Sequence, residues 1–434
     1  MPHRLDARQP GFARDFTALL ALKRDAEADV DAVVAAILAD VRERGDAALI
    51  DYTSRFDHLD LRKFGLRIAA EEIEAAAGRC DPAAVAALRA AAERIDSFHR
   101  KQLPDAISYS DEAGVRLGAR WTPVAAAGLY VPGGLAAYPS SVLMNAIPAR
   151  VAGVERIVMV VPTPQGEMNP LVLAAAQIAG VTEIYRIGGA QAVAALAYGT
   201  ESIPSVDKIV GPGNAYVAAA KRQVFGTVGI DLIAGPSEIL VVADGANRPD
   251  WIAADLMSQA EHDAAAQSIL VTDDPVFADK VVRAVDDLLP RLERRDIAAA
   301  SWRDFGAVVV VEDLEKAAAI VDRIAPEHLE LAVADPEALA ARIRHAGAIF
   351  LGRLTPEAVG DYVAGPNHVL PTSGSARFSS GLGVLDFMKR TSLVTCDGPA
   401  LGRIGPHAVT LARAEGLGAH ALSVSIRLDG RTDA

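Results

Sequence analysis

The order of hydrophobic and polar positions along the chain predicts an α/β protein. Residues 28–43 place apolar side chains at the three- and four-residue spacing of an amphipathic helix. The Ala-rich stretch 69–100 has the same spacing, interrupted at Asp81-Pro82, where Asp can cap a new helix and Pro fits its first turn. Residues 116–130 instead consist of short apolar runs, which indicate strands.

From residue 141 onward, buried strands and helices are expected to alternate. The expected helices cover residues 141–153, 168–179, 190–198 and 215–225, and the expected strands cover residues 156–161, 183–187, 208–210 and 239–242. This alternation implies a parallel sheet with right-handed crossovers, a Rossmann-like unit. A second alternation of similar build runs from 251 to 351, and the tail is expected to hold a helix at 406–415 and a strand at 421–428.

Composition limits the class of protein. A chain of 434 residues is too long for one ordinary core, and 51% hydrophobic with 23% charged residues describes a well-packed globular protein. The net charge of −13 argues against nucleic acid or an anionic membrane as the main partner. Residues 121–149 carry no charge, but Pro and Gly interrupt them, so no membrane span is expected.

The cysteines and the N-terminus favour a cytoplasmic location. Cys80 and Cys396 are the only cysteines and form no C-x-x-C motif, which is compatible with a reducing compartment. The first residues run into charged sequence without the apolar stretch of a secretory signal. We therefore expect a cytoplasmic protein that acts on a small molecule.

A polar group within the expected helix 251–261 and just after it is a candidate metal site. Gln259 and His262 are three residues apart, so on a helix they lie on one face. A His with an oxygen donor at that spacing is half of a zinc site. The alternative for an isolated Q-x-x-H is an exposed polar helix end.

The other histidines divide into two groups. Five are expected at the surface, namely His3, His58, His99, His345 and His407. His328, His368 and His420 instead fall at the ends of expected elements, beside Gly, Pro or an acidic residue. Glu327 and His328 together offer two proton-transfer groups with different ordinary pKa values, at an element end where open α/β sheets place functional groups. A solvated turn is the alternative.

Two further residues extend the candidate metal site. Asp361 lies on a loop constrained by Gly and Pro, and His420 precedes the last expected strand. The set Gln259, His262, Asp361 and His420 would be a four-ligand nitrogen and oxygen site for zinc or manganese. Since it contains no cysteine, it would be catalytic rather than structural. Spacing over this range does not show that the four residues meet in space.

Three Gly-rich turns, at 131–134, 187–191 and 211–214, each follow an expected strand and precede a helix. Backbone N–H groups in such turns can approach a ligand or a phosphate. None matches G-x-G-x-x-G, and Tyr216 stands where the third Gly would be. Three ordinary tight turns are an equal alternative.

Long motifs in a fixed order give a more specific indication. They are GLYVPGG (128–134), GGAQ (188–191), GPGNAY (211–216), AGPSE (234–238), SQAEH (258–262), APEH (325–328), GDY (360–362) and GPNHVLP (365–371). Together they resemble the histidinol dehydrogenase family over nearly the whole chain.

The resemblance implies a zinc-dependent enzyme of histidine biosynthesis. It would oxidise L-histidinol through L-histidinaldehyde to L-histidine and reduce two NAD in turn. The implied zinc ligands are Gln259, His262, Asp361 and His420; the acid–base pair is Glu327 and His328; the substrate contacts are Ser237, His368 and Glu415, together with the zinc ligands and His328; the NAD contacts are Tyr130, Gln191 and Asn214.

The resemblance also implies an assembly. The family is a homodimer in which the C-terminal segment crosses to the partner, so that His420 would complete the neighbouring site. The expected architecture has two Rossmann-like parallel-sheet domains, one inserted in the other. Its parts are an N-terminal helical arm (1–25), a discontinuous first α/β domain (26–129 with 238–380), an inserted NAD-binding domain (130–237) and a C-terminal segment (381–434).

Three other functions are compatible with parts of this pattern. A sister enzyme of the same superfamily could oxidise another small polyol or amino alcohol, such as a sulfonated propanediol, although His368 and Glu415 match the histidinol enzyme. A metal-dependent hydrolase would need zinc but no NAD. A non-catalytic nucleotide-binding module, like the hydrolase, would produce no NADH from histidinol.

Overall fold

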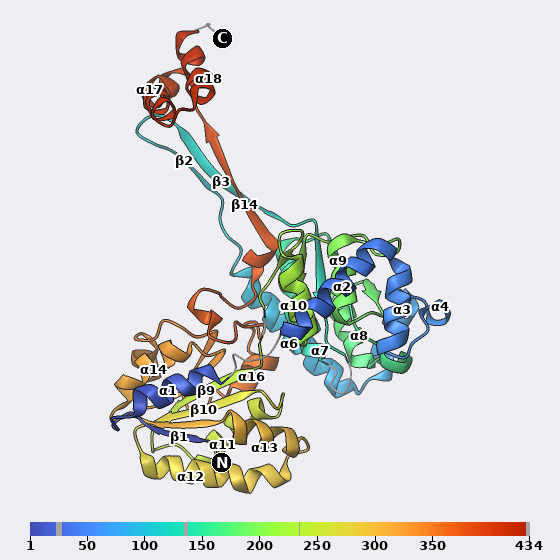
Figure 1. The fold of residues 1–434 in the computed structure, drawn as a ribbon, viewed down its shortest axis with the longest axis vertical. Helices are drawn as coiled ribbons and strands as arrows, with labels where there is room; N and C mark the ends of the chain where they lie inside the picture. The colour runs from blue at the N-terminus through green and yellow to red at the C-terminus, as the bar shows by residue number, and fades with distance from the viewer. Residues whose placement is uncertain (23–27, 134–137, 234, 431–434) are drawn as a thin grey trace. The chain divides into compact units, whose positions relative to one another are not determined.

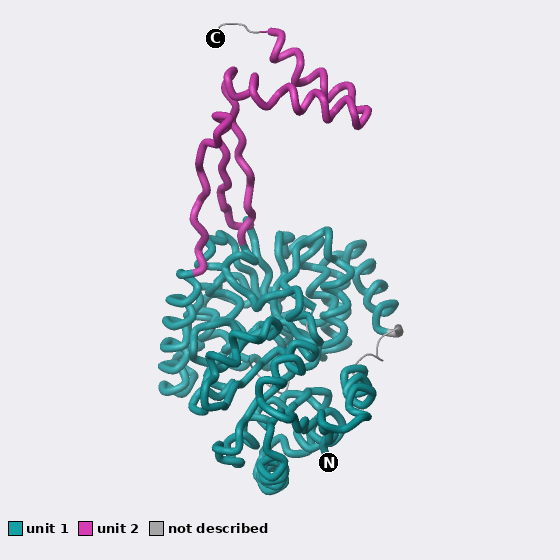
Figure 2. Tube along the Cα trace, turned by 90° about the vertical axis from the view of Figure 1, so that its left-hand side faces the viewer, with its two compact units in different colours: residues 1–101, 125–387 teal, residues 102–124, 388–434 magenta. Residues whose placement is uncertain are grey.

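The computed structural model describes residues 1–22, 28–133, 138–233 and 235–430 (Figure 1). The chain divides into two compact units, coloured teal and magenta in Figure 2. Unit 1 comprises residues 1–101 and 125–387, and unit 2 comprises residues 102–124 and 388–434. Gly134 and Ala234, which belong to two of the motifs, lie outside the described residues.

One sheet of unit 1 has six parallel strands in the order β1-β11-β10-β9-β12-β13. Its strands are β1 (His3–Asp6), β9 (Glu238–Ala243), β10 (Gln267–Thr272), β11 (Ala307–Val310), β12 (His328–Ala332) and β13 (Ala348–Leu351). Its helices are α1 (Phe12–Ala21), α11 (Pro249–Ala260), α12 (Pro275–Leu288), α13 (Arg295–Asp304), α14 (Ala317–Ile324), α15 (Pro336–Ala340) and α16 (Glu357–Tyr362).

Both faces of this sheet are covered, which explains the continuous apolar runs of its strands. Leu240 and Val242 of β9 pack with α1 and α14, whereas Ile239 and Val241 pack with α11, α12 and α13. Strands buried on both faces show no apolar–polar alternation, and each fully buried large side chain contributes roughly 1.5–3 kcal/mol.

The second sheet of unit 1 has five parallel strands in the order β6-β5-β4-β7-β8. Its strands are β4 (Ala126–Tyr130), β5 (Arg156–Val160), β6 (Glu183–Tyr185), β7 (Lys208–Val210) and β8 (Gly229–Ile230), and its helices are α7 (Pro139–Ala152), α8 (Pro170–Ala179), α9 (Gly189–Tyr198) and α10 (Ala215–Val224). The N-terminal helices are α2 (Ala28–Arg44), α3 (Asp46–Phe56), α4 (Leu61–Phe64), α5 (Ala70–Ala76) and α6 (Pro82–Arg100).

The two sheets have the same topology. In each, the chain runs from a central strand outward through two neighbours and then returns to the other side of the central strand. The central strands are β9 and β4, and the direction reverses between β9 and β12 and between β4 and β7. Two doubly wound units of this order are Rossmann-like, so the predicted α/β class with parallel sheets is confirmed.

The N-terminal segments distribute between the two sheets. Leu5 of β1 and Phe16 of α1 belong to the core of the six-stranded sheet. Val34 of α2 and Leu49 of α3 pack instead with the core of the five-stranded sheet. The expected division placed residues 26–129 in the domain of the six-stranded sheet, so the packing of α2 and α3 differs from it.

Unit 2 combines an antiparallel sheet with a helix pair. Its strands are β2 (Ile107–Ser110), β3 (Arg116–Pro123) and β14 (Met388–Thr395), in the order β14-β3-β2, and its helices are α17 (Gly398–Ala414) and α18 (Gly418–Asp429). Short 3₁₀ turns occur at Ala77–Arg79, Pro164–Gly166, Leu289–Arg291, Leu314–Lys316, Ser375–Arg377 and Val384–Phe387. Among the described helices, none has both the length and the apolar composition of a membrane span.

Three predictions are wrong. Asp361 was expected on a loop but lies in the short helix α16, which begins before the Gly-rich and Pro-rich segment that suggested a loop. The expected strand 421–428 is the helix α18, because the alternating sequence ALSVSIRL has a helical partner, α17, against which it packs. His99 was expected at the surface but is fully buried, and its Nδ1 donates a hydrogen bond to the Ile95 carbonyl at 2.8 Å. Its side chain lies on the inner face of α6, which contacts α7 and α8.

Candidate active site

The pair Glu327–His328 lies at the amino end of β12, beside the central strand β9. Glu327 Oε2 accepts a hydrogen bond from the N–H of Glu238 at 2.9 Å, and His328 Nδ1 donates one to the Glu238 carbonyl at 3.0 Å. Both side chains are buried. One residue of β9 therefore holds both groups through its backbone, and Nε2 is the ring nitrogen left for chemistry.

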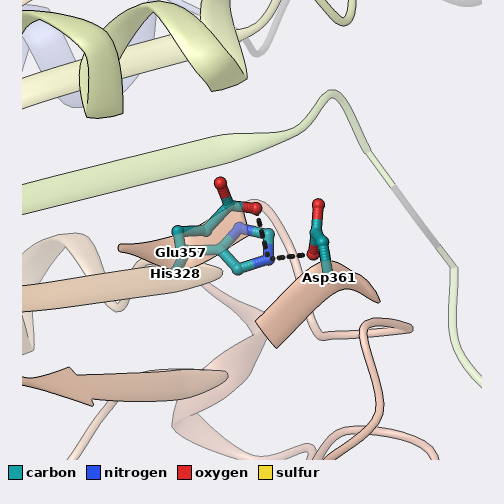
Figure 3. A group of neighbouring side chains, drawn as sticks. All are labelled: His328, Glu357 and Asp361. Atoms are coloured by element: carbon teal, nitrogen blue, oxygen red, sulfur yellow. Dashed lines mark ion pairs between the residues drawn. The ribbon is translucent and has the colours of Figure 1, made fainter. Parts of the chain in front are cut away.

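Two carboxylates face this ring nitrogen (Figure 3). His328 Nε2 lies 3.5 Å from Asp361 Oδ1 and 3.7 Å from Glu357 Oε1. Glu357 and Asp361 are four residues apart on the short helix α16, so they project from one face. The ligand atoms of the three residues lie within 4.8 Å of one another, an arrangement that could hold a metal ion.

Burial and charge shift the pKa values of this group. Burial raises the pKa of Glu327 to about 7, and burial together with the Asp361 charge raises that of Glu357 to about 8. Burial alone would lower the pKa of His328, but the charges of Glu327 and Asp361 raise it to about 10. Burial would raise the pKa of Asp361, yet His328 holds it well below its usual range.

Gln259 and His262 are located where α11 ends. Gln259 is 1% exposed, and its Oε1 has no hydrogen-bond partner within the described part of the chain. A buried acceptor left unpaired costs roughly 1–3 kcal/mol, so a cation ligated by this oxygen would remove a penalty. His262 follows the helix by two residues; burial lowers its pKa, and the Asp361 charge raises it. The two residues thus fit a site that includes Asp361.

His368 connects the two sheets of unit 1. Its Nδ1 donates a hydrogen bond to the Asp361 carbonyl at 2.9 Å, and its Nε2 lies 3.2 Å from the hydroxyl of Ser141, at the start of α7. Asn367 donates a hydrogen bond from its side chain to the Met144 carbonyl of the same helix at 2.5 Å. The candidate site therefore adjoins the segment that follows β4.

The remaining predicted substrate contacts are located differently. Ser237 immediately precedes β9, and its carbonyl accepts a hydrogen bond from the N–H of Gln267. Glu415 and His420 belong to unit 2, at the end of α17 and in α18, and both are exposed.

A second buried acid group, which the sequence reasoning missed, supports the site. Glu330 of β12 accepts a hydrogen bond from the N–H of Glu357 at 2.5 Å and shares another with Asp255 of α11. Burial raises the pKa of both acids, that of Asp255 to about 6. Asp255 is one helical turn before Gln259, so this link joins the helices that carry Gln259 and Asp361. In the sequence, the i,i+4 spacing of Glu357 and Asp361 is the one pattern that points to additional carboxylates at this site.

The predicted NAD contacts lie at the carboxyl end of the five-stranded sheet. Tyr130 ends β4, and its hydroxyl accepts a hydrogen bond from the N–H of Gly189 at 3.0 Å. Gln191 is buried in the first turn of α9, and exposed Asn214 caps α10 by accepting from the N–H groups of Tyr216 and Val217.

Ligands of doubly wound sheets bind at the carboxyl ends of the strands, where the strand order reverses, here between β4 and β7. A cavity of about 390 Å³ lies at this edge, beyond the ends of β4 and β5, and is lined in part by Gly133, Val161 and Pro162. Such a volume is within the range of ligand pockets.

Two doubly wound sheets and a buried acid–base pair beside candidate metal ligands define an enzyme of the α/β class. The family model described as histidinol dehydrogenase matches residues 21–428. Curated histidinol dehydrogenases from Rhodospirillum rubrum and Cereibacter sphaeroides are 72% and 67% identical to this chain, over 99% of both chains in each case.

The fold agrees with this relationship. The crystal structure of histidinol dehydrogenase from Elizabethkingia anophelis matches with a TM-score of 0.94 at 36% identity, covering 99% of this chain and 98% of that one. The chain belongs to the histidinol dehydrogenase family and is an oxidoreductase.

Proposed function

We propose that this protein oxidises L-histidinol through L-histidinaldehyde to L-histidine, the last steps of histidine biosynthesis, with zinc and NAD. Relatives that carry the histidinol dehydrogenase name at up to 72% identity support the substrate. The single structural observation behind the chemistry is the pair Glu327–His328, held on one residue of β9 with Nε2 directed at Asp361.

We propose that Gln259, His262 and Asp361, with His420 of the partner subunit, hold the zinc ion. The unpaired, buried Oε1 of Gln259 supports this set, because it is an oxygen donor without a partner in the described chain. Two imidazoles, a carboxylate and an amide oxygen, without cysteine, are typical of a catalytic site. Glu357 is a further carboxylate at this position.

When bound, zinc would orient the substrate nitrogens and NAD would accept a hydride in each of the two oxidations. In the first, His328 takes the hydroxyl proton at Nε2 as the hydride leaves the carbon. The hydrogen bond to Glu238 keeps the proton of the neutral ring on Nδ1 and so leaves Nε2 as the acceptor. A cation held by the Asp361 carboxylate would weaken the attraction of Asp361 for the imidazolium and so would favour the neutral ring that accepts the proton.

In the second oxidation, water adds to the aldehyde and the hydrate loses a hydride and a proton. Glu327 is the base for this water, because burial raises its pKa to about 7, close to the pH at which it must accept a proton. The N–H of Glu238 fixes one oxygen of this carboxylate. Each oxidation removes one hydride, which carries two electrons, and one proton from the substrate, and the added water supplies the second oxygen of the acid.

We propose Ser237, His368 and Glu415 as further substrate contacts, and Tyr130, Gln191 and Asn214 as NAD contacts. Tyr130 ends one of the two strands between which the order reverses, Asn214 follows the other, and Gln191 is two residues after Gly189, whose N–H binds the Tyr130 hydroxyl; these positions support their role. The contact between Ser141 and His368 supports a substrate site next to this crevice, because α7 directly follows β4 and its loop.

We propose a homodimer in which the segment 381–434 contributes Glu415 and His420 to the site of the partner. Unit 2 exposes apolar side chains on its two helices, among them Leu411 (64%), Leu422 (58%) and Ile426 (54%), which an interface would cover. We also propose a cytoplasmic location, since Cys80 and Cys396 are free thiols.

An NADH-release assay with L-histidinol tests this function. We expect two NADH per histidinol, no NADH after incubation with a chelator, and recovery when zinc is added back. Circular dichroism should show that the chelated chain stays folded. Full activity after complete zinc removal, or NADH from a sulfonated propanediol but not from histidinol, would contradict the proposal.

A further inference from the structure

A buried ion pair lies behind the 211–214 turn of the five-stranded sheet. Lys221 is on α10, and Asp231 directly follows β8. Their side chains form a salt bridge and are only 3% and 1% exposed. Removing two charges from water costs so much that apolar side chains of similar volume are often equally stable. Global stability is therefore a poor explanation for this pair.

Both charges also bind the same residue of the backbone. Asp231 Oδ2 accepts a hydrogen bond from the N–H of Gly211 at 2.7 Å, and Lys221 Nζ donates one to the Gly211 carbonyl at 2.9 Å. An apolar pair would fill the same space but leave this N–H and this carbonyl without partners. The ion pair thus does something for Gly211 that packing alone does not.

Gly211 is at the most constrained point of the crevice. Its φ is +113°, and a Cβ at this position would lie 2.1 Å from the carbonyl oxygen of Tyr130. The backbone therefore passes directly against the end of β4, where the strand order reverses. Because its N–H and carbonyl bind side chains rather than a neighbouring strand, those side chains determine how the peptide planes are oriented.

The turn leads from this buried point to an exposed one. Asn214, three residues on, is exposed, and its Oδ1 accepts from the N–H groups of Tyr216 and Val217. These capping bonds use only Oδ1, so the side-chain NH₂ group is left as a donor that could bind a ligand.

We propose that the Lys221–Asp231 ion pair positions the 211–214 turn for the dinucleotide. Lys221 and Asp231 would touch no cofactor and act through Gly211, which makes them positioning residues. This inference rests on the proposed use of NAD.

Two double variants separate positioning from stability. Lys221→Met/Asp231→Leu removes both hydrogen bonds to Gly211, whereas Lys221→Gln/Asp231→Asn keeps an acceptor for its N–H and a donor for its carbonyl without any charge. We expect the apolar variant to raise the KM for NAD about tenfold, the effect of about one lost hydrogen bond, and the amide variant to stay near wild type. The KM for L-histidinol and the zinc content should not change.

Another ion pair of the same sheet provides the control. Arg156 and Glu183 pair at 2.7 Å at the amino ends of β5 and β6, the opposite edge from the turn. Arg156→Met/Glu183→Leu should lower the melting temperature and leave the KM for NAD unchanged. Hydrogen exchange of the amides 211–217 should accelerate in the apolar Lys221 variant and not in this control.

Equal KM values for NAD in the apolar variant and wild type would overturn the proposal, as would equal losses in the apolar and amide variants. If the apolar variant does not fold, Lys221→Leu/Asp231→Asn, which keeps only the bond to the Gly211 N–H, should give a KM between those of the amide variant and a tenfold rise. A wild-type KM in that variant would also overturn the proposal. A wild-type enzyme that releases no NADH from histidinol instead refutes the proposed function, a result obtained before any variant is made.

Discussion

Apart from the additional edge strand β1, the two sheets of unit 1 share one strand order, but they present their polar residues at opposite edges. In the five-stranded sheet, Tyr130 and the 211–214 turn lie at the carboxyl ends of the strands, where doubly wound sheets usually bind ligands. In the six-stranded sheet, Glu327 and His328 lie at the amino end of β12, next to the first residue of β9. Ser141 and His368 show where the two edges meet.

The difference follows from what each edge offers. The carboxyl edge of the five-stranded sheet opens into Gly-rich turns and helix N-termini, whose N–H groups suit a phosphate. The amino edge of the six-stranded sheet is where α11 and α14 end and α16 lies, so polar side chains such as Gln259, Glu327 and Asp361 gather there. We propose that the same topology serves two chemistries, and variants can test each separately.

The largest effect is expected from Asp361→Ala. The substitution removes a proposed zinc ligand and the carboxylate nearest to His328 Nε2. Both oxidations should therefore slow by at least about 10³-fold, which is comparable to the rate loss when a general acid or base is removed. Zinc content, measured by mass spectrometry, should fall, whereas NAD binding measured by calorimetry should persist. Loss of NAD binding with retained zinc would show that the two edges are not separable.

Glu327→Gln, at the edge of the six-stranded sheet, should affect the two oxidations to different extents. Gln still accepts the N–H of Glu238 but cannot take a proton, so aldehyde oxidation should slow by about 10²–10⁴-fold and alcohol oxidation much less. Stopped-flow traces started from L-histidinol and from L-histidinaldehyde measure the two steps. The same loss in both would reject this division of labour.

Gln191→Ala should affect only the five-stranded sheet. If the side chain gives NAD one hydrogen bond, the KM for NAD should rise about tenfold, with no change in zinc content. Gln223→Ala is the matched control, because Gln223 is an exposed residue on α10 whose amide binds the Asp31 carbonyl instead. A similar KM for NAD in both variants would remove Gln191 from the cofactor site.

The smallest effect concerns the acid stability of the helices that cover the five-stranded sheet. Burial lowers the pKa of His99, so the unfolded chain binds a proton more readily than the folded one as the pH falls below the ordinary value of 6.5. The free energy of unfolding should then drop by at most about 1.4 kcal/mol per pH unit, and His99→Leu should remove this slope. Urea unfolding between pH 5 and 7 measures it; identical slopes would contradict it.

Much of the fold could be predicted because its strands are short, buried runs separated by amphipathic helices. The limits of β4, β7 and β12 follow from such runs and the adjoining Gly or Pro. The strand expected at 421–428 failed because ALSVSIRL alternates like a strand, and only its packing against α17 decides for a helix. Local pattern carries no information on such a partner.

The sequence motifs predict which residues form the candidate site, but they do not predict the neighbouring residues that hold those side chains in place. Gln259, His262, Glu327 and His328 belong to recognisable motifs. Glu357 and Glu330 were missed because their role depends on contacts between α11, β12 and α16, which sequence spacing does not contain. The general rule for open sheets does not account for this edge, because it points to carboxyl ends, whereas Glu327 and His328 occupy an amino end.

The attachment of Glu327 and His328 to the main chain of Glu238 has a consequence for substitutions at that position. Since the tether is a peptide group, it does not depend on the side chain at position 238, except that proline, which lacks the N–H, would release Glu327. The Glu238 side chain is buried and accepts a hydrogen bond from the Ser373 N–H at 3.1 Å, so a substitution at position 238 would disturb the contact with Ser373 while the main-chain tether of Glu327 and His328 stays in place.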